Sequence, residues 1–170
     1  MGVDTGAVYS LDAATGCVYW SFEAKAGIRT AISLGAIKGA SGTRTAVYFG
    51  DLKANVFAID ADTGAMIWTQ KADPHPLARV TGAPTLANGK LFVPVSSLEE
   101  GSGANDQYEC CTFRGSVIAF DAASGKQVWQ TFTVDPPKPP PVIREPMTPP
   151  SGPIDWAIST IASSSGQLTS

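Results

Sequence analysis

Short apolar runs separated by turns rich in Asp and Gly set the hydrophobic pattern of this chain. No long stretch carries the 3.6-residue apolar period of an amphipathic helix, and the runs are rich in β-branched and aromatic residues, which favours strands. In the run Val56–Ile59 every residue is apolar, so both faces of this strand are predicted to be buried. The pattern therefore predicts an all-β fold whose sheets are covered on both faces.

Internal repetition is the strongest feature of this pattern. Three segments align without gaps: GAVYSLDAATGCVYW (Gly6–Trp20), ANVFAIDADTGAMIW (Ala54–Trp68) and GSVIAFDAASGKQVW (Gly115–Trp129). Each predicts a strand, an Asp-x-x-Thr/Ser-Gly turn and a second strand, because an Asp carboxylate accepts backbone N–H groups and Gly supplies the positive φ that reverses the chain. A tryptophan at one fixed place in a β-repeat is predicted to dock between neighbouring sheets rather than to bind a ligand.

The spacing of the repeats is that of a β-propeller. The turn aspartates Asp12 and Asp60 lie 48 residues apart, and Asp60 and Asp121 lie 61 apart, whereas a four-stranded blade takes about 40–50 residues. The second interval therefore predicts a blade with an insertion between its second and third strands. The predicted strands of the two complete blades are Arg29–Leu34, Ala46–Gly50, Asn55–Asp60 and Ala65–Gln70, then Gly82–Leu86, Leu91–Val95, Ser116–Asp121 and Gln127–Thr133.

Composition divides the chain into three parts. Residues 1–134 hold the propeller blades, and residues 135–153 hold nine of the thirteen prolines, which excludes sheet and helix and predicts an extended loop. Residues 154–170 are predicted to contain the start of a further blade, near Ile154–Ile161, and a tail. Two complete blades and two part-blades do not close a ring of the usual four to eight. We therefore expect a partial β-propeller, that is, a fragment.

Charge and hydropathy exclude several classes of function. The formal net charge of −3 provides no basic surface for nucleic acid. No run of 18 apolar residues predicts a membrane span, and the residues that follow Met1 lack the basic and apolar regions of a signal peptide. Export would require a targeting segment that this sequence does not include.

Two of the three cysteines are adjacent, in YECCTFRG (Tyr108–Gly115), within the predicted insertion. Long loops at the end of a scaffold often carry function. The pair could form a vicinal disulfide, remain as two thiols, or bridge to a partner outside the chain. A metal site is a weaker alternative, because His75 is the sole histidine and no C-x-x-C spacing occurs. Cys17 is predicted to be a small buried apolar residue.

The repeat x-V-x-A-x-D-x-x-T/S-G-x-x-x-W resembles the tryptophan-docking repeat of the pyrroloquinoline quinone (PQQ) propellers. The runs VPVSSLEEGSGAN and YECCTFRGSVIAFDAASGKQVW are similar, more narrowly, to polyvinyl alcohol dehydrogenase and its relatives. The resemblance covers residues 2–134 well and 151–161 loosely. It implies an eight-bladed ring with PQQ and calcium near its axis, an alcohol substrate, a cytochrome electron acceptor and a periplasmic location.

The same resemblance implies where the calcium would bind. Ser96, Ser97 and Glu100 match a Ser-Ser-x-x-Glu run whose carboxylate binds the ion in the family, and calcium prefers hard oxygen ligands. Glu99 could take this role instead, and both glutamates could equally be solvated loop carboxylates. No catalytic residue is predicted, because the catalytic aspartate and its arginine partner lie in later blades of the family. The parent protein would be the enzyme, and the fragment alone is expected to be inactive.

Seven residues are implied to contact PQQ. Two hydroxyl groups would hydrogen-bond the quinone, two guanidinium groups would pair with its carboxylates, an indole would stack on its ring, and the cysteine pair would cap it. In that order they are Thr81 and Ser97, Arg29 and Arg114, Trp156, and Cys110 and Cys111. The hydroxyls could instead satisfy turn backbone, and the arginines could pair with surface carboxylates.

A second function from a different class stays open, namely a non-catalytic PQQ-like propeller that acts as a protein-interaction scaffold. The two are distinguished by geometry. Convergence of Thr81, Ser97, Glu100 and Trp156 at one end of the blades would favour the enzyme, and scattered positions would favour the scaffold.

Overall fold

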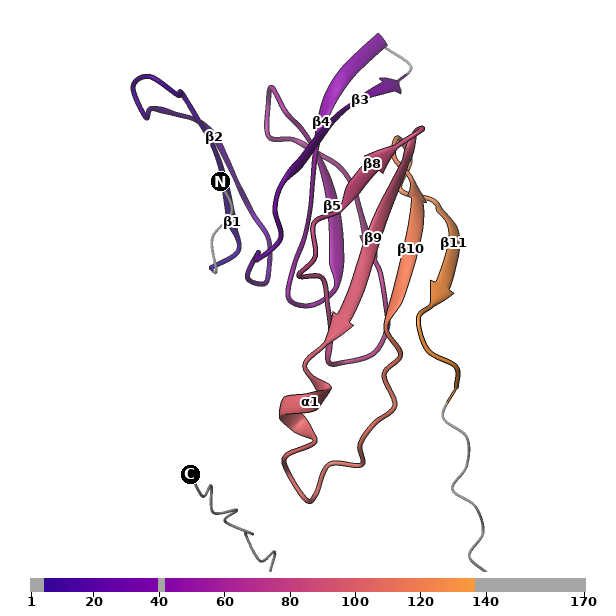
Figure 1. The fold of residues 1–170 in the computed structure, drawn as a ribbon. Coiled ribbons are helices and arrows are strands. Elements are labelled where there is room, and N and C mark those ends of the chain that lie inside the picture. The colour runs from indigo at the N-terminus through magenta and orange to yellow at the C-terminus, as the bar shows by residue number, and fades with distance from the viewer. Residues whose placement is uncertain (1–4, 40–41, 137–170) are drawn as a thin grey trace, which may run out of the picture. The chain divides into compact units, whose positions relative to one another are not determined.

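The computed structural model describes residues 5–39 and 42–136. This part of the chain holds eleven strands and one short helix, α1 (Glu99–Ser102). Figure 1 shows that β-strands make up its regular structure apart from α1. Its strands form three antiparallel sheets, which confirms the predicted all-β partial propeller. Trp156, the predicted strand Ile154–Ile161 and the proline-rich segment beyond residue 136 lie outside the described residues.

The first two sheets follow the predicted blades closely. One holds β1 (Ala7–Leu11) and β2 (Val18–Glu23), the outer half of a blade. The next is a complete blade in the order β3-β4-β5-β6. Its strands are β3 (Ser33–Gly39), β4 (Gly42–Gly50), β5 (Asn55–Asp60) and β6 (Met66–Lys71).

The first strand of this blade begins later than the predicted Arg29–Leu34, because Thr30 bonds the sheet through its side chain. The Thr30 hydroxyl accepts the backbone N–H of Gly50 at 3.1 Å and lies 3.4 Å from the Gly50 carbonyl oxygen. Side-chain bonds of this kind replace ladder bonds. Regular pairing therefore starts only at Ser33, which lies opposite Tyr48.

The third sheet has a broken first strand, and the prediction of one strand over Gly82–Leu86 is wrong. Two short strands, β7 (Ala78–Arg79) and β8 (Thr85–Ala87), both pair with β9 (Lys90–Ser97). The break falls where a Cβ on Gly82 would lie 2.5 Å from the Pro94 ring and where Pro84 has no N–H to donate. The sheet continues through β10 (Ser116–Asp121) to β11 (Gln127–Phe132).

The core consists of two apolar clusters, one between each pair of neighbouring sheets. Four successive residues of β5, Val56 to Ile59, are buried, which confirms that both faces of this strand are covered. On one face Phe57 stacks on Phe49 with ring centroids 5.1 Å apart. On the other, Trp68 packs against Phe120 of the third sheet at 6.1 Å.

The turns form as the repeat predicts. In each, the turn aspartate accepts the backbone N–H of the Thr or Ser three residues later, and the turn glycine has a φ of 73–74°. Docking of Trp20 and Trp68 on the next sheet is confirmed, because each indole N–H donates to a carbonyl there. Cys17 is exposed, so the prediction that it is buried is wrong. It ends the turn before β2, and its counterparts Ala65 and Lys126 are exposed too.

None of the helices among the described residues is long and apolar enough to cross a membrane.

Candidate functional site

A long connection at one end of the third sheet carries a network of polar contacts around a buried carboxylate. It leaves β9, contains α1 and returns to β10, and in Figure 1 it extends beyond the ends of both strands. This is the insertion predicted from the 61-residue repeat interval. Its position on a rigid pair of strands is one where scaffolds commonly place function.

Glu99 in α1 is the anchor of this loop. The residue is only 4% exposed. Its carboxylate accepts the backbone N–H groups of Thr112 at 2.6 Å and Phe113 at 2.8 Å, and the Tyr108 hydroxyl at 2.9 Å. Burial by itself would raise the pKa of Glu99, but these hydrogen bonds outweigh it and hold the pKa below its usual value. The carboxylate therefore stays ionised at neutral pH and ties both arms of the loop together.

His75 joins this anchor to the preceding blade. Its Nδ1 accepts the backbone N–H of Leu77 at 3.2 Å, so in the neutral imidazole Nε2 carries the proton and donates to the Thr112 hydroxyl at 3.1 Å. The same nitrogen lies 3.8 Å from a carboxylate oxygen of Glu99, and the ring meets Phe113 edge-on at 5.5 Å. The connection between blades and the inserted loop thus form one network.

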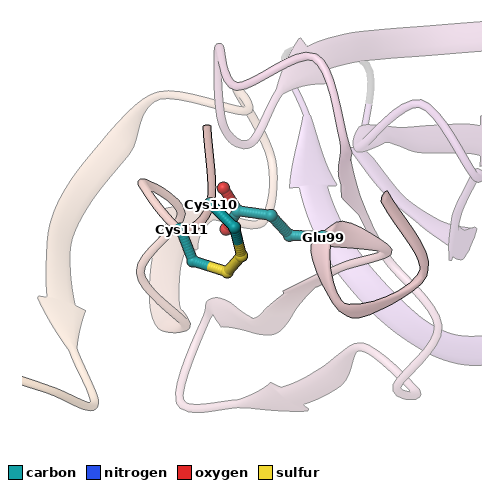
Figure 2. Close-up of side chains that lie close together, drawn as sticks. All are labelled: Glu99, Cys110 and Cys111. Carbon is teal, nitrogen blue, oxygen red and sulfur yellow. A yellow bond between two sulfur atoms is a disulfide. The ribbon is translucent and has the colours of Figure 1, made fainter. Parts of the chain in front are cut away.

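The cysteine pair lies directly beside the anchor, as Figure 2 shows. The structure joins the sulfur atoms of Cys110 and Cys111 to each other across a cis peptide bond. A carboxylate oxygen of Glu99 and both sulfur atoms all lie within 4.8 Å of one another. The group fits a metal ion poorly, because the sulfur atoms are bonded to each other and both Glu99 oxygens already accept hydrogen bonds. The group fits a structural role better, in which Glu99 and the bonded cysteines hold the loop in one conformation.

Several residues predicted to bind the cofactor gather where the inner strands meet this loop. The Thr81 hydroxyl lies 3.2 Å from that of Ser96, and Ser97 pairs with Ala78 of β7 and accepts the backbone N–H of Glu99 at 3.3 Å. Glu100 lies exposed on α1, beside the buried Glu99. The structure therefore brings Ser97 and Glu100 to one end of the sheet, with Thr81 beside the strand that leads there. Trp156 lies outside the described residues.

Of the two predicted arginines, Arg114 lies at the end of the inserted loop, next to the Glu99 network, and Arg29 lies in the preceding blade. The guanidinium of Arg114 donates to the Val134 carbonyl at 2.7 and 3.1 Å and covers the Phe132 ring at 4.0 Å. It lines a cavity of about 480 Å³ with His75 and Phe132, beside β11, the strand at the opposite edge of the sheet from β7. Arg29 is exposed ahead of β3, in the preceding blade. Their pairing with cofactor carboxylates stays a prediction.

The sequence did not single out Tyr108 or Thr112, and it offered Glu99 only as an alternative ligand. Each contributes to the Glu99 network because its hydrogen-bond partner is close in space although it is distant in sequence. Neither a motif nor a periodic spacing marks them. The one available signal was the pair of adjacent glutamates in a short helical turn, since only one of two neighbours on a helix can face the loop.

Fold and loop together define a blade segment of a β-propeller. The chain belongs to the PQQ-like repeat family: the family model PQQ_2, described as outer membrane protein assembly factor BamB, matches residues 4–169. The chain is 44% identical over 129 residues to a polyvinylalcohol dehydrogenase of Pseudomonas sp., and this match covers 76% of the chain and 20% of that protein. It is 34% identical to the quinohemoprotein alcohol dehydrogenase ADH IIB of Pseudomonas putida, covering 75% of this chain and 17% of that protein.

Comparison with solved structures also finds alcohol dehydrogenases with this fold. The quinohemoprotein alcohol dehydrogenase ADHIIG of Pseudomonas putida HK5 matches with a TM-score of 0.57 and 27% identity, over 78% of this chain and 18% of that one. A europium-containing methanol dehydrogenase shares the fold, with a TM-score of 0.52 and 21% identity over 74% and 21% of the two chains. The resemblance to quinoprotein dehydrogenases noted in the sequence is confirmed. The chain spans about a fifth of the length of these proteins.

Proposed function

We propose that this chain is part of a PQQ-dependent dehydrogenase that oxidises an alcohol, of the polyvinyl alcohol dehydrogenase type. The observation that carries the proposal is the inserted loop of the third sheet, in which the buried Glu99 lies beside the cysteine pair and its backbone N–H donates to the Ser97 hydroxyl at the end of β9. The names of the similar proteins support the reaction class. The whole protein would carry the activity, and residues outside this segment would complete the site.

In this proposal the two adjacent glutamates have different roles. Glu99 holds the loop, since hydrogen bonds from the loop engage both of its oxygens. Glu100 is exposed and remains available to a hard cation, which would need six to eight oxygen ligands in total if it is calcium. The described residues supply one side-chain carboxylate to that set, so they fit such a site only in part.

The other residues would position the cofactor rather than do chemistry. Thr81 and Ser97 would donate hydroxyl hydrogen bonds, and Cys110 and Cys111, as a vicinal disulfide, would cover one face of the site. When bound, PQQ would accept the hydride equivalent of the alcohol. The cysteine pair is exposed among the described residues, which leaves its surface available for such a contact.

The cellular setting follows the same proposal. We expect a periplasmic protein, in which a vicinal disulfide would be stable, and a cytochrome that accepts the electrons. One of the similar proteins is named as the dehydrogenase subunit of a quinone-type alcohol dehydrogenase in Gluconobacter oxydans, which supports a protein partner for the parent protein.

A second candidate function is a non-catalytic scaffold. It is favoured by one observation, that the matching family model is described as an outer membrane assembly factor. A scaffold propeller has no evident use for a buried carboxylate that fixes two bonded sulfur atoms, so the dehydrogenase remains the preferred proposal.

Calorimetric titration of PQQ, with and without calcium, into the intact parent protein tests the two functions. We expect calcium-dependent binding that is lost in Glu100→Gln and retained in Glu109→Gln, a matched change at another exposed glutamate of the loop. Glu99→Gln should bind weakly because the loop is released. Failure of a folded parent protein to bind PQQ would establish the scaffold instead.

A further inference from the structure

A cavity of about 480 Å³ lies where the connection between the second and third sheets passes beside β11. Its walls come from residues 73–75 of that connection, from residues 112–114 ahead of β10, and from Gln130 and Phe132 of β11. Gln130 lies opposite Ile118, and directly opposite residues of an antiparallel pair share one face of the sheet. Ile118 packs in the core between the second and third sheets. The cavity therefore lies between two complete blades, and its volume falls in the range of small-molecule sites, roughly 300–1,000 Å³.

Asp73 is a buried carboxylate with unused hydrogen-bonding capacity in this cavity. The residue is 8% exposed, and one of its carboxylate oxygens accepts the backbone N–H of His75 at 2.8 Å. Within residues 5–39 and 42–136, no group donates to the other oxygen and no cation pairs with it. An ionised carboxylate is costly to bury without a partner. The free oxygen therefore favours a ligand that brings a positively charged donor.

Arg114 supplies the opposite charge on another wall. Its Nε and Nη2 donate to the Val134 carbonyl at 3.1 and 2.7 Å, and its guanidinium covers the Phe132 ring at 4.0 Å. These contacts fix the guanidinium, whereas its Nη1 has no acceptor in the part of the chain that the structure describes. Arg114 and Asp73 both line the cavity, yet no ion pair joins them there. Two unpaired opposite charges on separate walls favour a ligand that carries both charges.

The rest of the cavity surface is mainly aromatic. Phe113 and Phe132 both line it, and Phe132 is 43% exposed. Aromatic rings of this kind pack well against an apolar or aromatic side chain. The amide nitrogen of Gln130 donates to the Ser116 hydroxyl at 3.1 Å, which leaves the amide oxygen of Gln130 as a second acceptor.

We propose that this cavity binds a zwitterionic amino acid with an apolar side chain. The ammonium group would donate to Asp73 and to the Gln130 amide oxygen, the carboxylate would accept from Nη1 of Arg114, and the side chain would lie against Phe113 and Phe132. The backbone N–H groups of residues 112 and 113 also hold Glu99, so the bound ligand would stabilise the inserted loop. The inference is independent of the proposed dehydrogenase function.

Calorimetric titration of the intact parent protein with three matched probes tests the site. L-phenylalanine carries both charges, phenethylamine lacks the carboxylate, and 3-phenylpropionate lacks the ammonium group. We expect saturable binding of L-phenylalanine and binding weaker by roughly tenfold or more for each of the others, since each loses a charge-assisted hydrogen bond. Absence of saturable L-phenylalanine binding to the folded protein, or equal binding of a probe with one charge, would overturn the proposal.

Two substitutions locate the charges. Asp73→Asn and Arg114→Gln should each weaken L-phenylalanine binding by roughly tenfold or more. The amide oxygen in Asp73→Asn can still accept the His75 backbone N–H, so the local turn should persist. Asp62→Asn and Arg44→Gln, at exposed positions of the second blade, are the matched controls and should bind as the wild type does. Circular dichroism checks that each variant is folded, and undiminished binding in folded Asp73→Asn or Arg114→Gln would contradict the site.

Limited proteolysis provides a second readout. Opening of the inserted loop would remove residues 112–114 from the cavity and release the ligand. With L-phenylalanine at about ten times its Kd, cleavage within residues 103–115 should therefore slow by roughly tenfold. Asp73→Asn should show much less protection at the same concentration. Equal cleavage of the wild type with and without saturating ligand would overturn the placement of the ligand against this loop.

Discussion

The indole nitrogen of Trp68 lies 3.0 Å from the carbonyl oxygen of Ala122, across 54 residues of sequence. This hydrogen bond joins the outermost strand of the second sheet to the turn between β10 and β11 of the third. The Tyr48 hydroxyl donates to the same carbonyl at 3.0 Å. One backbone acceptor therefore holds two large side chains of the neighbouring blade, and it sets the register in which the two sheets pack.

Trp68→Ala is expected to destabilise the chain strongly. It removes a 7% exposed indole from the interface and leaves a cavity, which typically costs about 3–5 kcal/mol of unfolding free energy. Urea denaturation followed by circular dichroism measures the change. Trp129→Ala, at the equivalent but exposed position, should cost under about 1 kcal/mol under monomeric conditions. Equal costs for the two would show that docking does not stabilise the blades.

Gly125→Ala separates contact from backbone strain. A Cβ at this position would lie 2.6 Å from the Trp68 ring, so the ring must shift, at a typical cost of about 1–3 kcal/mol. The positive φ adds about 1–2 kcal/mol for any side chain. Gly16→Ala carries only the second cost, because nothing lies near its added Cβ. Denaturation midpoints should therefore rank wild type, Gly16→Ala and Gly125→Ala in falling order.

The sequence predicted what local chemistry determines and missed what distant partners determine. The three turns and the strands beside them follow from the Asp-x-x-Thr/Ser-Gly pattern, which acts within a few residues. The start of β3 depends on Thr30 meeting Gly50, and the break before β8 depends on how closely Gly82 approaches Pro94. Neither contact is visible in a periodic pattern.

The candidate site shows the same division. The Ser-Ser-x-x-Glu run and the adjacent cysteines both predicted that the inserted loop carries the candidate site. Which of Glu99 and Glu100 is buried depends on backbone N–H groups 13 and 14 residues away from Glu99. Two adjacent carboxylates are chemically equivalent in a sequence, so only the folded loop distinguishes them.

Glu99→Gln is expected to loosen the loop, whereas Glu100→Gln should not. The neutral amide accepts hydrogen bonds from Thr112 and Phe113 less strongly than the carboxylate does, and the loop should open more often. Limited proteolysis should then cleave within residues 103–115 faster in Glu99→Gln, by roughly tenfold. The exposed Glu100 serves as the control. Equal cleavage rates in the two variants would show that Glu99 does not anchor the loop.

The oxidation state of the cysteines can be counted directly. If Cys110 and Cys111 are joined as in the structure, the native chain should show one reactive thiol, that of the exposed Cys17. Reduction should raise the count to the three cysteines of the sequence. A thiol reagent with an optical readout gives both numbers, and Cys17→Ser should lower each by one. Three thiols in air-oxidised native protein would exclude the vicinal disulfide.

Tyr48 should make the fold sensitive to alkali. Burial, followed by the nearby charge of Asp121, raises the pKa of its hydroxyl to about 12 from the usual 10.0, and the hydroxyl is fully buried on the Ala122 carbonyl. In the unfolded chain the phenol ionises near its ordinary pKa. Its contribution to stability is therefore complete below about pH 10 and is lost as the pH rises towards 12.

The loss attributable to Tyr48 should be on the order of 1–2 kcal/mol after allowance for solvent screening. Unfolding free energies measured by urea between pH 8 and roughly pH 11 test it, with Tyr48→Phe as the matched variant, which keeps the ring and removes the ionising group. The variant should start less stable, because the hydrogen bond is gone, and should lose less stability with rising pH. Parallel pH profiles for the two proteins would show that Tyr48 does not link the fold to pH.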